Sequence, residues 1–458
     1  MDRSQADHTG PLVERGGLTW EAHPVRELWR LSGPMIVSLL SVSAMTLVDT
    51  LFIGWLGSTE LAAVGLGGMG VFTVVSFGTA LFGAARVRVG EAVGAGEQHV
   101  VRAELGAFLR VALVLGLGST LLTAAGAYLL PLLGKDAATT HLARDYMLVR
   151  ALSCPCVLLT QALAQWRQAR GDSAGPMRAT LLANVVHLPL DALFVFALGW
   201  GVSGAAWATL ASAGTEVALL FALQKRDGFF WEQSSFRGAL TSALRGLPTG
   251  IERALDMIAF TAVPLLLLEV GAVHVAAHQI VLQLSLLSFL PLIALSDAVC
   301  ILVSQAVGAQ RPRLFVRLTR AGVTLTGAYA LALGLLFVSI PSVLIRLFNE
   351  EPSVVAIGVR TLALAALLQG INAFYNLAKG ILRGLSAIRF VAWVAVICAW
   401  VFTPPLTYLW GVRWGYGAPG AWMALCTETF VGTLIMGRRV LRHPLWLAAH
   451  AAQPQDGS

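Results

Sequence analysis

An acidic side chain lies inside a stretch of the chain that is otherwise long and apolar. Asp49 falls in the apolar run from Leu31 to Leu56, eight positions before Gly57. Hydrocarbon is expected to surround such a run, and a carboxylate there costs at least a few kcal/mol unless it is paired or protonated. Asp49 therefore indicates a functional site and predicts a partner elsewhere in the chain.

A second polar group interrupts the fifth apolar run. Asn184, His187 and Asp191 are spaced so that one face of a helix carries all three. Asp191 precedes a glycine by eight positions, as Asp49 does. At ~1.5 Å per residue, both acids would lie roughly 12 Å below the outer helix ends. We expect Asp49 and Asp191 to be level and, if they share one cavity, to bind a proton that His187 could share.

A structural interpretation of the same residues stays open, because polar side chains also hold membrane helices together by hydrogen bonds. Two further acids lie in apolar runs, Asp256 in the seventh and Glu428 in the last. Asp256 is a second-lobe candidate for the same chemistry. Its alternative is an ion pair with Arg253, three residues earlier on the same helix.

The composition defines the class of protein that holds these acids. Hydrophobic residues make up 57% of the chain and charged residues 12%, with a mean hydropathy of +0.73. Twelve apolar stretches recur between Leu31 and Met436. Because lipid leaves no partner for exposed backbone groups, these stretches must be helical. We predict an all-α integral membrane protein with twelve transmembrane helices in two six-helix, pseudo-symmetric lobes.

The charge pattern predicts the orientation of the chain. Most of the 32 lysines and arginines fall in alternate loops, which favours placing both termini in the cytoplasm. The net charge of +7 is explained by this bias, so no nucleic-acid partner is expected. No cleavable signal peptide is recognisable, and the five cysteines lack metal-ligand or disulfide spacing.

One offset recurs when the sequence is compared with itself. Pro34 matches Pro248, and Gly57 matches Gly271, both 214 positions apart, and the offset becomes 216 toward the end of each unit. This indicates a duplicated unit in parallel orientation around a midplane cavity. The predicted organisation is a cytoplasmic tail over 1–25, lobes over 26–224 and 246–440, a cytoplasmic linker over 225–245, and a cytoplasmic tail over 441–458.

Several common catalytic motifs are absent from the sequence. It contains no HExxH, no DDxxD and no glycine-rich phosphate loop. We expect the protein not to be an enzyme, and to use no cofactor and no resident metal.

Several motifs together resemble the multidrug and toxin extrusion (MATE) family of secondary transporters, over about Arg26 to Arg439. They are Pro34…Asp49…Ile53-Gly54-Trp55-Leu56-Gly57, Glu91-Ala92-Val93-Gly94-Ala95-Gly96, Asn184 to Asp191, Gly204-Ala205-Ala206-Trp207, Gly246-Leu247-Pro248-Thr249-Gly250, and Ile381-Leu382-Arg383-Gly384. The resemblance implies two six-helix lobes forming a V. It also implies substrate export driven by inward movement of protons or sodium ions.

The resemblance implies roles for single residues. Asp49 and Asp191 match two acids of the proton-coupled, DinF-like branch, Thr209 a threonine near the cation site, and Pro34 a proline at which the first helix bends. Pro248, its counterpart in the repeat, is the second expected hinge. Asp256 matches an acid of the sodium-coupled, NorM-like branch.

Three positions depart from the family pattern. His187 and Gln165 stand where asparagines are usual, and Asn372 stands where the NorM-like branch has a carboxylate. A histidine favours proton over sodium chemistry. Gln165, Asn372 and Glu428 are expected to line the substrate cavity.

We expect a monomeric, multi-pass antiporter of the plasma (inner) membrane, surrounded by lipid. It would export amphipathic organic cations in exchange for protons by alternating access. The alternatives are a sodium-coupled multidrug antiporter and a lipid-linked oligosaccharide flippase of a related helical plan. A receptor or structural membrane protein and an integral-membrane enzyme are alternatives from other classes.

Overall fold

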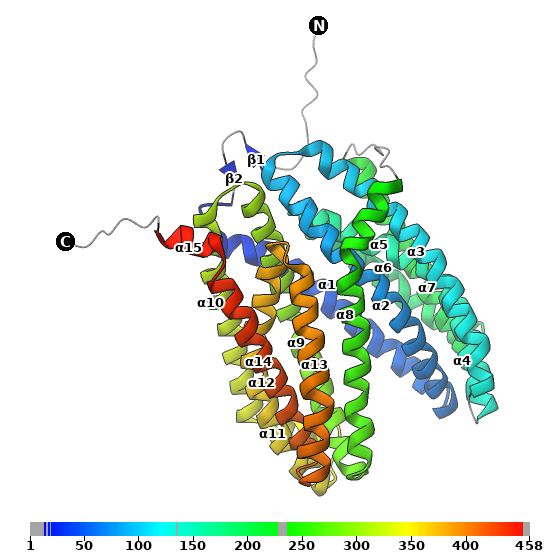
Figure 1. Ribbon diagram of the computed structural model, residues 1–458. Helices are drawn as coiled ribbons and strands as arrows, with labels where there is room; N and C mark the ends of the chain where they lie inside the picture. Colours follow the sequence, from blue (N-terminus) through cyan, green and yellow to red (C-terminus); the bar gives the residue numbers. More distant parts are fainter. Residues whose placement is uncertain (1–12, 15–16, 19, 134–135, 228–235, 452–458) are drawn as a thin grey trace. The chain divides into compact units, whose positions relative to one another are not determined.

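The computed structural model describes residues 13, 14, 17, 18, 20–133, 136–227 and 236–451, almost all of them helical (Figure 1). The described residues also contain two short strands, β1 (Val13–Glu14) and β2 (Gly17–Leu18), which pair antiparallel before the first helix. The predicted all-α class is confirmed apart from this two-residue ladder.

In the described part of the first half, the chain forms seven helices and one π-helical turn. They are α1 (Pro24–Gly54), α2 (Ser58–Ala95), α3 (Gln98–Leu133), α4 (Ala137–Ala151), α5 (Cys154–Ala169), α6 (Ala174–Ala192), η1 (Leu193–Ala197) and α7 (Gly201–Arg226). The pair α4 and α5 is bent by 47° and makes one broken span.

The second half repeats this order with added short helices. Its elements are α8 (Phe236–Leu268), α9 (Ala272–Gly308), α10 (Pro312–Ser339), α11 (Pro341–Arg346), α12 (Pro352–Gly384), α13 (Ile388–Leu406), η2 (Thr407–Arg413), α14 (Ala418–Leu441) and α15 (Pro444–Ala451).

Length and composition identify most of the membrane spans. Within the described residues, nine helices are long and apolar enough to cross a bilayer, and the bent pair α4 and α5 adds a tenth. The other two long helices are α8 and α14, which carry the acids Asp256 and Glu428. With these two, each half has six spans, and the expectation of twelve is confirmed.

The duplication is visible in the backbone. Gly57 and Gly271 precede α2 and α9 with φ angles of 152° and 138°, a region that favours glycine. The π-helical turns η1 and η2 begin 214 positions apart. Two later pairs of glycines with positive φ, Gly199 with Gly415 and Gly201 with Gly417, are 216 apart. The two extra residues of the second half therefore lie at η2, which has seven residues where η1 has five.

Residue contacts divide the chain into two compact units. The first contains Val37–Gly250 with the described residues before Glu21, and the second contains Glu21–Ile36 with the described residues from Ile251. The boundary cuts α1 and α8, each two residues after a predicted hinge, Pro34 or Pro248. Neither proline ends its helix, and the hinge role stays a prediction.

The predicted linker over 225–245 is helical at both ends, because α7 extends to Arg226 and α8 begins at Phe236. Residues 228–235 of this segment lie outside the described residues.

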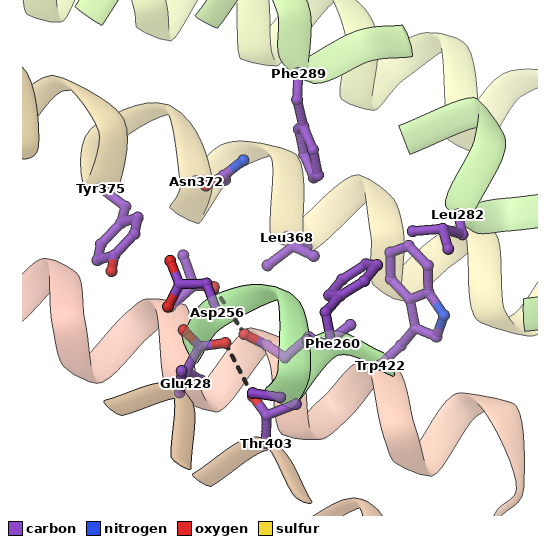
Figure 2. Close-up of a pocket in the computed structure, with 14 residues that line it drawn as sticks. Asp256, Phe260, Leu282, Phe289, Leu368, Asn372, Tyr375, Thr403, Trp422 and Glu428 are labelled. Carbon is purple, nitrogen blue, oxygen red and sulfur yellow. Dashed lines mark hydrogen bonds between the residues drawn. The ribbon is translucent and has the colours of Figure 1, made fainter. Parts of the chain in front are cut away.

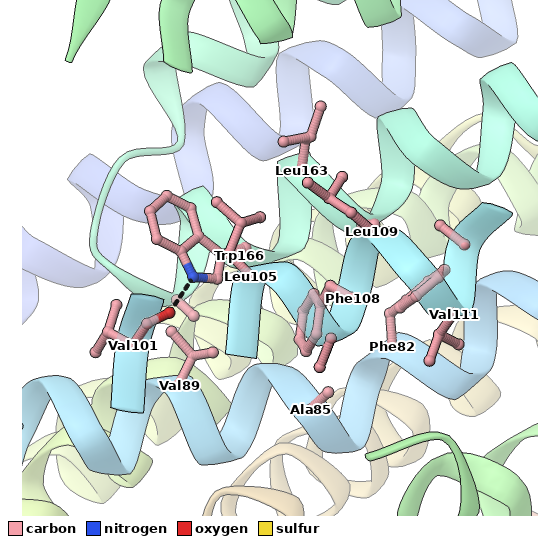
Figure 3. Packing of buried hydrophobic residues seen from close by; sticks show 14 of the residues in the cluster. Phe82, Ala85, Val89, Val101, Leu105, Phe108, Leu109, Val111, Leu163 and Trp166 are labelled. Carbon is pink, nitrogen blue, oxygen red and sulfur yellow. Dashed lines mark hydrogen bonds between the residues drawn. The ribbon is translucent and has the colours of Figure 1, made fainter. Parts of the chain in front are cut away.

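A large apolar cluster fills the first unit between α2, α3, α5 and α7 (Figure 3). Phe82 and Phe108 pack with their ring centroids 5.7 Å apart. The indole of Trp166, which is 1% exposed, donates a hydrogen bond of 2.9 Å to the Val101 carbonyl. The indole thus satisfies its polar group where water is excluded. This apolar cluster helps to position α6 and α7 in the first unit.

Candidate functional site

Three titratable side chains of the first unit meet at one point. Asp49 in α1, and His187 and Asp191 in α6, each offer a ligand atom, and these atoms all lie within 4.8 Å of one another. His187 Nε2 is 3.8 Å from Asp49 Oδ1. The structure therefore brings together the two acids that helical depth predicts at one level, and the histidine that shares a helix face with Asp191.

Contacts on both sides of Asp49 hold α1 against α6 and its continuation. Toward the start of α1, the Asn184 side-chain amide donates a hydrogen bond of 2.7 Å to Ser41 Oγ. Toward its end, Ile53 is fully buried in a small cluster with Val195 and Ala205. Asn184, predicted as part of the cation site, thus acts here on α1 through Ser41.

A change of helix type begins just after Asp191. Pro189 lies inside α6 and has no backbone N–H to donate. Two residues beyond Asp191 the chain enters the π-helical turn η1. π-Helical turns occur often at functional sites because they shift side chains relative to a regular helix.

The cluster is shielded from solvent at Asp191 and partly exposed to solvent at Asp49. Asp191 is 0% exposed and His187 3% exposed, whereas the Asp49 side chain is 26% exposed. Both carboxylate oxygens of Asp191, Asp49 Oδ1 and His187 Nε2 are buried without a hydrogen-bond partner among the described residues. Unsatisfied polar atoms at this depth cost several kcal/mol. A proton or a cation held by the cluster would remove this cost.

One cation that the sequence analysis did not single out acts on the cluster. Arg150, in the last turn of α4, interacts electrostatically with both Asp49 and His187. Its guanidinium donates a hydrogen bond of 3.3 Å to Ser153 Oγ. The sequence does not indicate that Arg150 lies near Asp49 and His187, because α4 is more than thirty residues away from either of them along the chain.

The two other predicted residues of the first unit have different surroundings. Thr209 in α7 donates its hydroxyl to the Ala205 carbonyl of its own helix at 2.9 Å. Gln165 in α5 donates a hydrogen bond of 3.4 Å to the Thr79 carbonyl, and its own side-chain oxygen is buried without a partner. Neither residue belongs to the cluster of three, so their roles stay predictions.

The second unit contains an acidic, aromatic pocket (Figure 2). Asp256 from α8, Asn372 from α12 and Glu428 from α14, all predicted site residues, line it. Thr403 Oγ1 donates a hydrogen bond of 3.0 Å to Glu428. Thr403 and the aromatic rings of the lining were not predicted from the sequence; the rings belong to Phe260, Phe289, Tyr375 and Trp422. Together with the acids, these residues come from five helices, α8, α9, α12, α13 and α14.

The alternative role for Asp256, an ion pair with Arg253, is not formed among the described residues. The neighbouring carboxylate of Glu252 instead pairs with Lys379 Nζ at 2.7 Å and with Arg383 at 2.9 Å. Lys379 and Arg383 lie in the last turns of α12. Asp256 is left facing the pocket.

Comparison with known proteins identifies the family. The sequence profile of the MatE family matches residues 34–193 and 248–409, one copy in each half of the chain. The chain belongs to the MatE family. The two matches start 214 positions apart, which is the offset of the internal repeat.

Relatives of this MatE chain extend over almost its whole length. A "probable multidrug resistance protein NorM" of Aromatoleum aromaticum is 26% identical and covers 91% of this chain and 94% of its own. One of Deinococcus radiodurans is 28% identical, covering 91% and 95%. The bent form of the Vibrio cholerae MATE transporter VcmN has the same fold, with a TM-score of 0.80, 22% identity and coverage of 95% and 98%.

Members of the MatE family are transporters, so this chain is an integral membrane transporter and not an enzyme. Assignment to the DinF-like branch stays a prediction. The orientation with both termini in the cytoplasm also stays a prediction.

Proposed function

We propose that this MatE-family chain exports small organic cations in exchange for protons. The observation that carries the proposal is the cluster of Asp49, His187 and Asp191, in which a fully buried carboxylate has no hydrogen-bond partner among the described residues. Such a group is costly unless an ion occupies it. A proton entering and leaving the cluster would link it to a gradient.

The proposed exchange needs two charge states of the cluster. A shared proton neutralises one carboxylate and offsets the repulsion between two acids whose oxygens lie within 4.8 Å. Loss of that proton leaves a negative site that favours the substrate-bound form. Reprotonation from the other side of the membrane releases the substrate. Each full cycle moves substrate and proton in opposite directions.

The pocket of the second unit supports a cationic substrate. Asp256 and Glu428 supply negative charge, and the rings of Phe260, Tyr375 and Phe289 supply faces that attract cations. Its volume of about 190 Å³ is below the range of roughly 300–1,000 Å³ that encloses a drug-sized ligand. We infer that the charged end of the substrate binds here. The acidic lining disfavours the pyrophosphate of a lipid-linked oligosaccharide.

Protons are favoured over sodium as the coupling ion by His187. An imidazole nitrogen binds a proton, whereas hard cations such as sodium are bound by oxygen ligands. The names of the relatives, multidrug resistance proteins, support export of diverse organic compounds. We place the chain in the plasma (inner) membrane with both termini in the cytoplasm, in agreement with its charge bias.

The test is efflux of a fluorescent organic cation from proteoliposomes under an imposed pH gradient and, separately, an imposed sodium gradient. We expect the pH gradient alone to drive efflux, and Asp49→Asn and Asp191→Asn each to reduce it at least tenfold. Asp145→Asn is the matched control, because Asp145 is a half-exposed acid of the same unit, paired with Arg144. Efflux driven only by sodium, or undiminished in both variants, would contradict proton coupling at this cluster.

A further inference from the structure

We propose that Asp49, His187 and Asp191 form a binding site for a divalent ion of the zinc class, and that the bound ion blocks transport. The binding part stands on the geometry of the cluster. The blocking part rests on the proposed proton coupling, because the ion would occupy the atoms that exchange the proton.

The set of donors fits zinc chemistry. One imidazole nitrogen and two carboxylates are ligands that Zn²⁺ uses, and three protein ligands with one water are typical of zinc sites that remain open. The imidazole distinguishes this cluster from an all-oxygen site, which suits Mg²⁺ and Ca²⁺ better. Two carboxylates would also balance the double charge of the ion.

The distances are close to those of a zinc site. Zinc binds nitrogen and oxygen at roughly 2.0–2.2 Å, so two of its ligand atoms are separated by at most about 4.4 Å. His187 Nε2 and Asp49 Oδ1, 3.8 Å apart, already satisfy this limit. Ligand atoms of a tetrahedral zinc site lie roughly 3.4 Å apart. The spread of 4.8 Å across the whole cluster therefore closes with side-chain movements of roughly 1–1.5 Å.

Burial and access both favour the site. Asp191 and His187 direct atoms that have no hydrogen-bond partner among the described residues into the cluster. The partly exposed Asp49 side chain leaves a way in for an ion. Within the part of the chain that the structure describes, no other group of three histidine, cysteine or acidic side chains has this geometry.

Two effects oppose binding of the zinc ion at this cluster. The positive charge of Arg150 acts on Asp49 and His187 and lowers the affinity for any cation. Protons compete directly, since metal ligands must be deprotonated. Zinc and a proton therefore exclude each other at this cluster.

Binding is tested with the full-length protein in detergent, titrated with Zn²⁺ against a chromophoric chelator. We expect one zinc per chain, and an affinity at least tenfold lower in His187→Asn and in Asp191→Asn. His141→Asn is the matched control, an exposed histidine of the same unit, and should bind like the parent. Absence of stoichiometric binding, or equal affinity in all four proteins, would overturn the site.

X-ray absorption at the zinc edge of the parent protein gives a readout that needs no variant. The expected spectrum has oxygen and nitrogen neighbours with the scattering of a single imidazole. Sulfur neighbours or two imidazoles would place the ion elsewhere and overturn the proposal.

Transport is measured on the same preparations in proteoliposomes. Zinc should inhibit efflux driven by the pH gradient in the parent and in His141→Asn, at the concentrations that saturate binding. Stoichiometric binding without inhibition would overturn the blocking part alone. Absence of any efflux driven by a pH gradient would instead contradict the proposed function and leave the binding result intact.

Discussion

At the scale of single residues, the protein holds buried carboxylates in two contrasting ways. Glu252 is 3% exposed and both of its oxygens accept hydrogen bonds from Arg383, with Lys379 adding a third contact. Asp191 is equally buried, yet its oxygens have no partner among the described residues. The paired acid has a structural explanation, and the unpaired acid belongs to the cluster that we propose exchanges protons.

Glu252→Gln should destabilise the second unit. The change leaves Lys379 and Arg383 without their carboxylate, and breaking a buried pair from one side costs about 3–5 kcal/mol. We expect a clear fall in the unfolding temperature in detergent, which is measured by intrinsic fluorescence. Glu269→Gln, at an exposed acid just after α8, is the control and should leave the temperature unchanged. Equal temperatures for the two variants would show that the ion pairs do not contribute to stability.

The two acids of the Asp49, His187 and Asp191 cluster could be predicted from the sequence, because depth along a helix can be counted from its end. Asp49 and Asp191 were placed at one level by their equal distances from the following glycines. Contacts between distant helices cannot be counted in this way. Arg150 and Ser41 were therefore missed, as was the aromatic lining contributed by separate helices of the second unit.

At the scale of elements, glycines decide how closely the helices of the second unit approach. A Cβ on Gly384 of α12 would lie 2.7 Å from the Cys300 carbonyl of α9, and one on Gly380 would overlap the Ser296 carbonyl. The two glycines are four positions apart, the spacing of a small-residue interface between membrane helices. α12 thus packs on α9 backbone to backbone.

Gly384→Ala should force these helices apart and destabilise the protein by about 1–3 kcal/mol. Gly370→Ala in the same helix is the control, because a Cβ there meets no atom within 4 Å. Alanine is the better helix former, so the control should unfold at the same or a slightly higher temperature. A Gly384→Ala protein as stable as the control would contradict the close packing. The comparison uses thermal unfolding in detergent.

Hydrophobic runs predicted the helices well, since the need to satisfy backbone groups in lipid dominates local preference. Breaks within a span were harder. The bend between α4 and α5 and the π-helical turns η1 and η2 were not predicted, because prolines and tertiary contacts decide them. The two-residue gain of the second half was predicted from glycine matches, and the structure places it at η2.

At the scale of the whole molecule, the two halves share a fold and differ in chemistry. Asp49 corresponds in the repeat to Val263, which is fully buried, and Asp191 corresponds to Pro405. Asp256 corresponds to Val42. The first unit therefore has the cluster proposed for proton exchange, and the second has the pocket proposed for the substrate.

Release of protons on substrate binding tests the central claim most directly. An organic cation is added to the detergent-solubilised protein in weakly buffered solution containing a pH-indicator dye. We predict that the parent and Asp145→Asn release protons in proportion to the substrate bound. Asp49→Asn combined with Asp191→Asn mimics the protonated cluster, so it should bind substrate more weakly and release no proton for each substrate that it binds. Equal proton release by the double variant would contradict proton exchange at this cluster.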